Sequence, residues 1–155
     1  MQVCCEFDIL KKAIAMCTDT NGRFVYLNPK IGGQRSVIES VCNIVASGAK
    51  PLAITDCLNY GDPNDPEIFW ELHQSCQGIA DACEILETPV VSGNVSLYNE
   101  NNGKAIYPSP MIGMVGLIKD YDHVIPMHMQ KQATRFISLV KQTMILPAQN
   151  CKDDH

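Results

Sequence analysis

The sequence predicts an α/β (α+β) fold in which helices cover one face of a mixed sheet. The chain has 155 residues, which is enough for one domain that buries roughly 70% of the surface of its unfolded chain. Short apolar segments rich in β-preferring residues alternate with two segments of helical periodicity. That alternation is also typical of doubly wound nucleotide-binding folds. However, neither helical segment opens with a G-x-G-x-x-G or P-loop motif, so we favour the mixed layer.

The first half of the chain predicts a strand, a helix and a second strand. Residues 24–27, Phe-Val-Tyr-Leu, consist of β-preferring residues and predict a short strand. After Gly32-Gly33, apolar residues recur at steps of three and four as far as Val45, which predicts a helix. The two glycines fit either an anion nest or a plain turn, and we leave them out of the site. Residues 51–58 then predict a buried strand.

The second helix has a clear start signal. Asp65 is a good cap, Pro66 suits the first turn, and Glu67 is favoured by the helix dipole. The helix is expected to run to about Glu87. Its apolar spacing predicts a buried face made of Phe69, Leu72, Cys76, Ile79, Cys83 and Leu86.

Two further strands are expected after this helix, over residues 90–98 and 105–119. They are joined across Asn101-Asn102-Gly103, whose residues tolerate positive φ in a tight turn. Pro108 and Pro110 cannot donate hydrogen bonds to a neighbouring strand. The last strand is therefore expected either to lie at an edge of the sheet or to be broken at these prolines.

Composition excludes several classes of function. The net charge of −5 and pI near 5.2 argue against a nucleic-acid surface or an anionic membrane. The longest apolar stretch, residues 111–118, is far shorter than the ~20 residues that a membrane span needs. The first residues lack the features of a secretory signal, so a cytoplasmic location is expected. The eight cysteines and four histidines show no C-x-x-C or other metal-ligand spacing.

Small oxygen-bearing side chains gather at the ends of two predicted strands. Residues 52–55 lead into Asp56, and residues 89–91 lead into Ser92-Gly93-Asn94-Val95-Ser96. Glycine allows a ligand to approach the backbone, asparagine offers an oxygen to a hard cation, and serine offers a hydroxyl. Such residues bind phosphate, metal or sugar, and the two strand ends are expected to share one site. In the absence of other information, an Asp or Asn in this position is most often a turn former.

These segments closely resemble one enzyme family. The matching segments are TDTNGRFVYLNPKIGGQ, ITDCLNYGDP followed by PEIFW, and TPVVSGNVSLYNENNGKAIYPSPMIGMVGLI. They resemble the phosphoribosylformylglycinamidine synthase family, in the first domain of its second half, from about Thr18 to about Asp122. The resemblance implies an aminoimidazole ribonucleotide synthase N-terminal-like domain over residues 18–130. Residues 1–17 would be an extension, and residues 131–155 a remnant of the following domain, expected to lack order.

The resemblance also implies a reaction and a set of roles. The family is a ligase of purine biosynthesis that converts formylglycinamide ribonucleotide to formylglycinamidine ribonucleotide, using ATP and glutamine. By motif position, Asp56 and Gly93 would contact ATP, Asn94 would bind Mg²⁺, and Ser96 would contact the substrate. No catalytic residue is carried over, because the family's proton-transfer histidine lies in a part that this chain does not contain. The implied partners are a glutaminase subunit and a small bridging subunit.

A second interpretation is a non-catalytic module for dimerisation or assembly. The predicted sheet has more apolar strand residues than two helices are expected to cover, which would leave one face open. A homodimer through this face, with Asp56 and Asn94 near its seam, is the expected outcome. The strand residues expected to contribute are Val25, Ile54, Val91, Val95, Met114 and Leu117.

Overall fold

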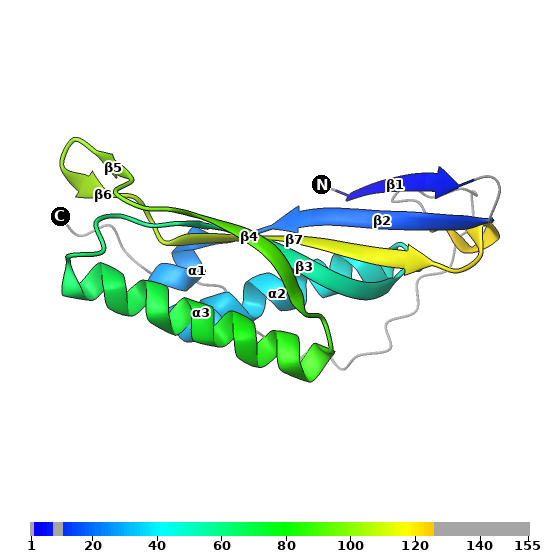
Figure 1. Cartoon of the computed structure of the whole chain (residues 1–155), viewed down its shortest axis with the longest axis horizontal. Helices are drawn as coiled ribbons and strands as arrows, with labels where there is room; N and C mark the ends of the chain where they lie inside the picture. Colours follow the sequence, from blue (N-terminus) through cyan, green and yellow to red (C-terminus); the bar gives the residue numbers. More distant parts are fainter. Residues whose placement is uncertain (1, 8–10, 126–155) are drawn as a thin grey trace, which may run out of the picture.

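The computed structural model describes residues 2–7 and 11–125, and it contains a five-stranded mixed sheet. In spatial order the strands are β1 (Gln2–Phe7), β2 (Lys12–Asp19), β7 (Ser109–Ile118), β3 (Lys50–Asn59) and β4 (Val90–Ser96). Strands β3 and β4 are parallel, and the other neighbours are antiparallel. Figure 1 shows the helices together on one side of the sheet. The predicted fold class is therefore confirmed.

The helices that cover the sheet are α1 (Gly22–Leu27), α2 (Pro29–Ala46) and α3 (Pro66–Leu86). The hydrophobic core lies between these helices and the sheet. Every second side chain of a strand points into it, because successive side chains point to opposite faces. In β7 this alternation buries Ile112, Met114 and Ile118, and in β2 it buries the small residues Ala13, Ala15 and Cys17.

Helices α2 and α3 touch backbone to backbone through two glycines. A Cβ atom at Gly33 would collide with the carbonyl oxygen of Ser75, and one at Gly78 would collide with that of Lys30. Any larger residue at either position would push the two helices apart. The sequence analysis allowed a nest or a turn at Gly32-Gly33. Both alternatives are wrong, because these residues lie inside α2.

The strand expected at residues 24–27 is instead the short helix α1. The carbonyl of Asn21 accepts hydrogen bonds from the amides of Phe24 at 3.1 Å and Val25 at 3.3 Å. Val25 is fully buried, and its backbone lies where a Cβ of Gly32 would be. Packing against α2 thus overrides the β preference of these side chains, which is a weak and context-dependent property.

The first residues of the chain belong to the sheet. The sequence analysis treated residues 1–17 as an extension, whereas in the structure they supply β1 and most of β2. Strand β2 pairs with β7, with Ala13 opposite Ile118. Small inward residues such as Ala13 and Ala15 give a weak strand signal by composition, which explains why this strand was missed. The expected remnant over residues 131–155 lies outside the described residues.

The second helix and the turn after β4 match their predictions. The Asp65 carboxylate accepts a hydrogen bond from the Glu67 amide at 2.9 Å, and α3 ends where Glu87 takes a left-handed conformation with φ 54°. Phe69 is an exception, because it is 56% exposed rather than buried. Residues Asn102 and Gly103, with φ 51° and 73°, form the turn between β5 (Glu100–Asn101) and β6 (Lys104–Ala105).

The prolines interrupt the last strand without placing it at an edge. Pairing stops after β6 and resumes at Ser109, so the predicted break is present. However, β7 lies in the middle of the sheet, between β2 and β3, so the alternative of an edge strand is wrong. Pro110 is accommodated at the start of β7, opposite Leu58.

The face of the sheet away from the helices carries fewer of the expected apolar residues than predicted. Val25 is in α1, and Ile54 and Met114 point toward the helices and are buried. Val95 is opposite buried Leu58, so it faces the helix side, and Val91 lies at the irregularity in the β3–β4 pairing; both are exposed at the sheet edge. Leu117 does lie on the open face, because it alternates with buried Ile118. The exposed apolar side chains that share this face are Met16, Met111 and Val115, at 37%, 40% and 36%. Among the described helices, none is long and apolar enough to cross a membrane.

Candidate functional site

The parallel pairing of β3 with β4 brings the four predicted site residues into three of four consecutive positions of the ladder. Asp56 is opposite Gly93, Cys57 is opposite Asn94, and Asn59 is opposite Ser96. Both strands end here, and β4 is an edge strand. The two strand ends therefore lie side by side, as the sequence analysis expected.

Asp56 and Gly93 lie on the helix side of the sheet. Asp56 is in register with buried Ile112 and alternates with buried Ile54 and Leu58, and paired residues project to the same face. A Cβ atom at Gly93 would collide with the Asp56 carboxylate. Glycine at this position thus leaves the space that the carboxylate fills.

The Asp56 carboxylate is partly withdrawn from solvent and held by the backbone. Its burial raises the pKa, and a hydrogen bond from the Asn94 backbone amide acts in the opposite direction. Desolvation disfavours the charged form, whereas an amide donor favours it. The carboxylate is thus fixed beside the strand end, with a raised affinity for a proton.

Asn94 and Ser96 lie on the opposite, open face of the sheet. The Asn94 side-chain nitrogen is 4.0 Å from the Cys57 sulfur. The Ser96 hydroxyl is 3.3 Å from Asn99 Oδ1, and the Asn99 side-chain nitrogen donates to the Ser96 carbonyl at 2.8 Å and to the Tyr60 carbonyl at 3.0 Å. The four residues are therefore divided between two faces, two on each. A ligand that contacts all of them must reach around the edge of β4.

The sequence analysis left out a polar strip on the open face. Thr55 donates to the Ser92 carbonyl at 3.1 Å, and the Ser92 hydroxyl donates to Thr55 Oγ1 at 2.8 Å. Asn59 donates to the Ser109 carbonyl at 3.3 Å. The signal for this strip was Thr55 and Asn59 on one strand and Ser92, Asn94 and Ser96 on the next, because residues at even spacing share one face of a strand.

The residues at the strand ends offer few ligands for a magnesium ion. Asn94 offers an amide oxygen, which suits Mg²⁺, but the nearby carboxylate of Asp56 lies on the other face. Within residues 2–7 and 11–125, no three His, Cys, Asp or Glu side chains are grouped so as to hold a metal. Mg²⁺ is usually bound by one or two carboxylates together with substrate phosphates and waters. The described residues thus supply one ligand of the right kind and do not form a complete metal site.

Three cysteines in or against the core have thiols with a raised pKa. Cys17 is buried, donates to the Ser40 carbonyl at 3.4 Å, and has its pKa raised to about 12, mainly by burial. Burial likewise raises the pKa of Cys76 and Cys83. These thiols stay protonated at neutral pH and pack as small apolar groups.

A mixed sheet covered on one face by helices is the fold of a known domain family. The family model described as "AIR synthase related protein, N-terminal domain" matches residues 4–118, and the chain belongs to this family. Among curated proteins, it is similar to phosphoribosylformylglycinamidine synthase subunit PurL of Lactobacillus acidophilus. The two are 86% identical over 133 residues, which cover 86% of this chain and 18% of that protein.

Solved structures agree with this relationship. Phosphoribosylformylglycinamidine synthase II of Thermotoga maritima is 34% identical, with a TM-score of 0.70 over 75% of this chain and 19% of that one. The same protein has been solved with ATP and with FGAR, each at a TM-score of 0.69. In PurLQS of T. maritima the TM-score is 0.74 at 32% identity, over 81% of this chain and 21% of that one. The chain spans about a fifth of the length of these relatives.

Proposed function

We propose that this chain acts as one domain of a phosphoribosylformylglycinamidine synthase. The enzyme would use ATP and glutamine to convert formylglycinamide ribonucleotide to formylglycinamidine ribonucleotide, in the purine pathway of the cytoplasm. The observation that carries the proposal is the 86% identity over 133 residues to PurL of L. acidophilus. The complexes of T. maritima PurL with ATP and with FGAR support the choice of ligands.

Within that enzyme we assign a contact to each residue of the strand-end site. Asp56 and the backbone of Gly93 would contact ATP, Asn94 would supply one oxygen to Mg²⁺, and Ser96 would hydrogen-bond the substrate. Because β4 is an edge strand, a ligand lying along its outer side can approach both faces. None of the four residues moves a proton in this proposal. Their contribution is to bind and orient, and orientation by itself lowers the barrier of a phosphoryl-transfer step.

The remaining parts of the reaction would come from outside this chain. The net charge is −5, and a triphosphate needs cations or donors beyond those found here. The glutaminase and small bridging subunits would deliver ammonia, and the PurLQS structure of T. maritima is consistent with such partners. We therefore expect the chain alone to show no synthase or ATPase turnover.

The proposal is tested by grafting. The aligned 133-residue segment replaces its counterpart in L. acidophilus PurL, and synthesis of formylglycinamidine ribonucleotide is measured with the partner subunits present. The graft should be active, and Asn94→Ala or Ser96→Ala within it should each lower kcat/KM roughly ten- to a hundredfold, as expected for a lost hydrogen bond or ligand to a charged group. Asn101→Ala, in the exposed strand β5, is the matched control. An inactive graft, or full activity in both variants, would contradict the proposal.

The second candidate function is assembly without catalysis. It is favoured by the open face of the sheet, where exposed Met16 on β2 is paired with exposed Val115 on β7 and Met111 lies on the same face of β7. Contiguous apolar surface of this kind is uncommon on a monomer and is typical of an interface. The face that would pair in this case is the one that also carries Asn94 and Ser96.

A further inference from the structure

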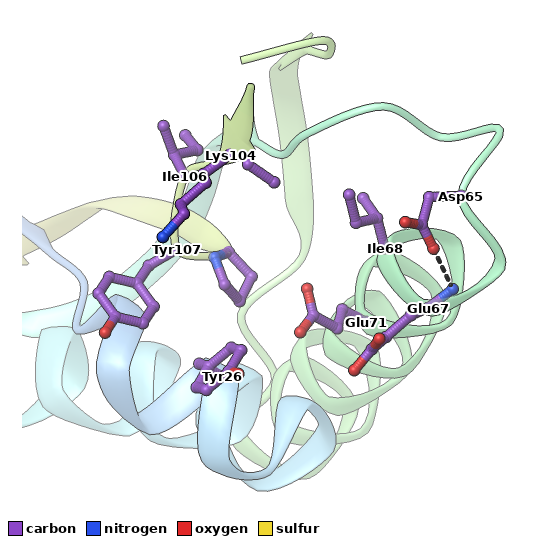
Figure 2. Close-up of a pocket in the computed structure, with 10 residues that line it drawn as sticks. Tyr26, Asp65, Glu67, Ile68, Glu71, Lys104, Ile106 and Tyr107 are labelled. Carbon is purple, nitrogen blue, oxygen red and sulfur yellow. Dashed lines mark hydrogen bonds between the residues drawn. The ribbon is translucent and has the colours of Figure 1, made fainter. Parts of the chain in front are cut away.

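A second polar cavity lies away from the strand-end site. It is a cleft of about 830 Å³ between the first turns of α3, helix α1, and the segment from β6 to the start of β7. Figure 2 shows the acidic side chains of α3 on one wall and the two tyrosines on the other. Its lining includes none of Asp56, Gly93, Asn94 and Ser96.

Glu71 places in this cleft a carboxylate without a partner among the described residues. The residue is only 8% exposed, yet its carboxylate points into the cavity (Figure 2). Within the described part of the chain, the ion pairs are Lys30 with Asp81 and His123 with Asp120, and no side-chain hydrogen bond reaches Glu71. Burial, and then the charges of Glu67 and Asp65, raise its pKa. The carboxylate oxygens reach the cleft while the rest of the residue is buried, so the group is partly withdrawn from water and has no partner in the described part of the chain. A bound cation would offset part of that desolvation cost.

The geometry of the walls excludes a simple metal ion and favours an organic cation. The three carboxylates of the cleft are not grouped closely enough to hold a metal. The rings of Tyr26 and Tyr107 meet edge to face with centroids 5.3 Å apart. Aromatic faces attract cations, and the adjacent Ile68 and Ile106 can cover an apolar stem. The single lysine, Lys104, leaves the cavity with an excess of negative charge.

We propose that this cleft binds an alkylguanidinium group, with the guanidinium on Glu71 and the alkyl stem between the tyrosines and isoleucines. A guanidinium is planar, carries five donors that match a carboxylate, and stacks on aromatic rings, whereas an ammonium is a compact and strongly hydrated charge. The group can belong to an arginine side chain of another polypeptide segment or to a free small molecule. The recognition chemistry is the same in both cases.

The test uses the complete 155-residue chain and two probes of matched shape. Butylguanidine and the uncharged butylurea are titrated separately at pH 7, and binding is followed by amide chemical shifts in NMR spectra. Butylguanidine should shift the amides around Glu71, Tyr26 and Tyr107, and should bind roughly tenfold or more tightly than butylurea. Equal affinity for the two probes, or no shift with butylguanidine, would overturn the proposal.

A pair of variants locates the site. Glu71→Gln keeps the shape of the side chain and should lower butylguanidine affinity roughly tenfold or more. Glu84→Gln, on the exposed side of the same helix, should leave it unchanged. Because the pKa of Glu71 is raised, its ionisation costs stability as pH rises through that pKa, so Glu71→Gln should melt at a higher temperature than the wild type at pH 7. Unchanged affinity in this folded variant would also overturn the proposal.

A third probe distinguishes the sources of the cation. A short blocked peptide, acetyl-Gly-Arg-Gly-amide, is titrated in the same way. Binding that matches butylguanidine would identify a site open to an arginine of another polypeptide segment. Binding of butylguanidine alone would identify a site for a free small cation. In either case affinity should fall as the pH is lowered through the raised pKa of Glu71, because the carboxylate then takes up a proton.

Discussion

The absence of a side chain at Gly93 makes room for the Asp56 carboxylate. The Asp56 carboxylate fills the space that any other residue at position 93 would occupy, and it accepts a hydrogen bond from the Asn94 amide. Gly93→Ala should displace that carboxylate. The loss of its hydrogen bond should cost about 0.5–1.5 kcal/mol of the free energy of unfolding, measured by denaturant titration of the chain.

A double-mutant cycle checks this explanation. In an Asp56→Ala background the carboxylate is already absent, so Gly93→Ala should cost less than it does in the wild type. Equal costs in the two backgrounds would mean that the backbone of β4, and not the Asp56 carboxylate, opposes the larger residue. The same cycle in the grafted enzyme would show whether the two residues act together on ATP.

The sequence could locate the strand-end site but not its shape. The motif positions of Asp56, Gly93 and Asn94 follow from the sequence. The period of two in a strand also predicts that Gly93 and Asn94 face opposite sides of the sheet. The division of all four residues between the two faces does not follow from the sequence, because it depends on which residue of β4 is opposite Asp56. The Glu71 cleft could not be predicted either, because a glutamate in an amphipathic helix is expected to face solvent, whereas Glu71 is a buried residue of α3. It is covered by residues near β6, more than thirty positions later.

At the scale of elements, the pairing of α2 with α3 is the most sensitive contact. Gly78→Ala would place a methyl group against the carbonyl oxygen of Lys30, which is backbone and cannot rotate away. We expect a loss of about 1–3 kcal/mol, which is typical of an overpacked contact, and a melting temperature lower by several degrees. Glu84→Ala, an exposed change on the same helix, should stay within about 0.5 kcal/mol of the wild type.

Thermal unfolding followed by circular dichroism measures both variants under one condition. A Gly78→Ala variant as stable as the control would mean that α2 and α3 can separate without loss, which would contradict the close contact seen here. Gly33→Ala, which faces the Ser75 carbonyl on the other side of the same contact, should behave like Gly78→Ala.

Elements with a strong local signal were predicted, and those that depend on tertiary packing were not. Helix α3 has a cap, a proline in its first turn and a regular apolar face, so its bounds followed from sequence. Helix α1 has six residues with β-preferring side chains and forms because Val25 packs against α2. Strand β2 buries only small residues, and it pairs with β1 and with β7, the last strand of the sheet. A local sequence pattern does not indicate which distant strand pairs with β2.

For the whole molecule, the open face of the sheet predicts self-association. We expect a homodimer at micromolar concentration, paired through the face that carries Met16, Met111 and Val115. Val115→Lys would place a charge in the middle of that interface and should give a monomer, as measured by light scattering. Ile85→Lys, at a side chain of α3 that is 79% exposed, is the matched control and should leave the dimer intact.

The expected seam also changes in light of the structure. Asn94 and Ser96 lie on the open face, whereas Asp56 lies on the helix side, so only the first two would be close to a partner. A wild-type chain that is monomeric and binds no hydrophobic dye would contradict the interface. The exposed apolar residues would then be better explained by contact with other domains of a larger enzyme.

The order of the strands determines how this domain can form during synthesis. Strand β7 is the last strand of the sheet to leave the ribosome, yet it lies in the middle, with β2 on one side and β3 on the other. Ala13 must therefore wait for Ile118, which at roughly 5–20 residues per second takes roughly 5–20 s. A nascent chain that stops before Ser109 would hold two unconnected strand pairs and no continuous sheet, so its apolar residues would be open to chaperones until the central strand arrives.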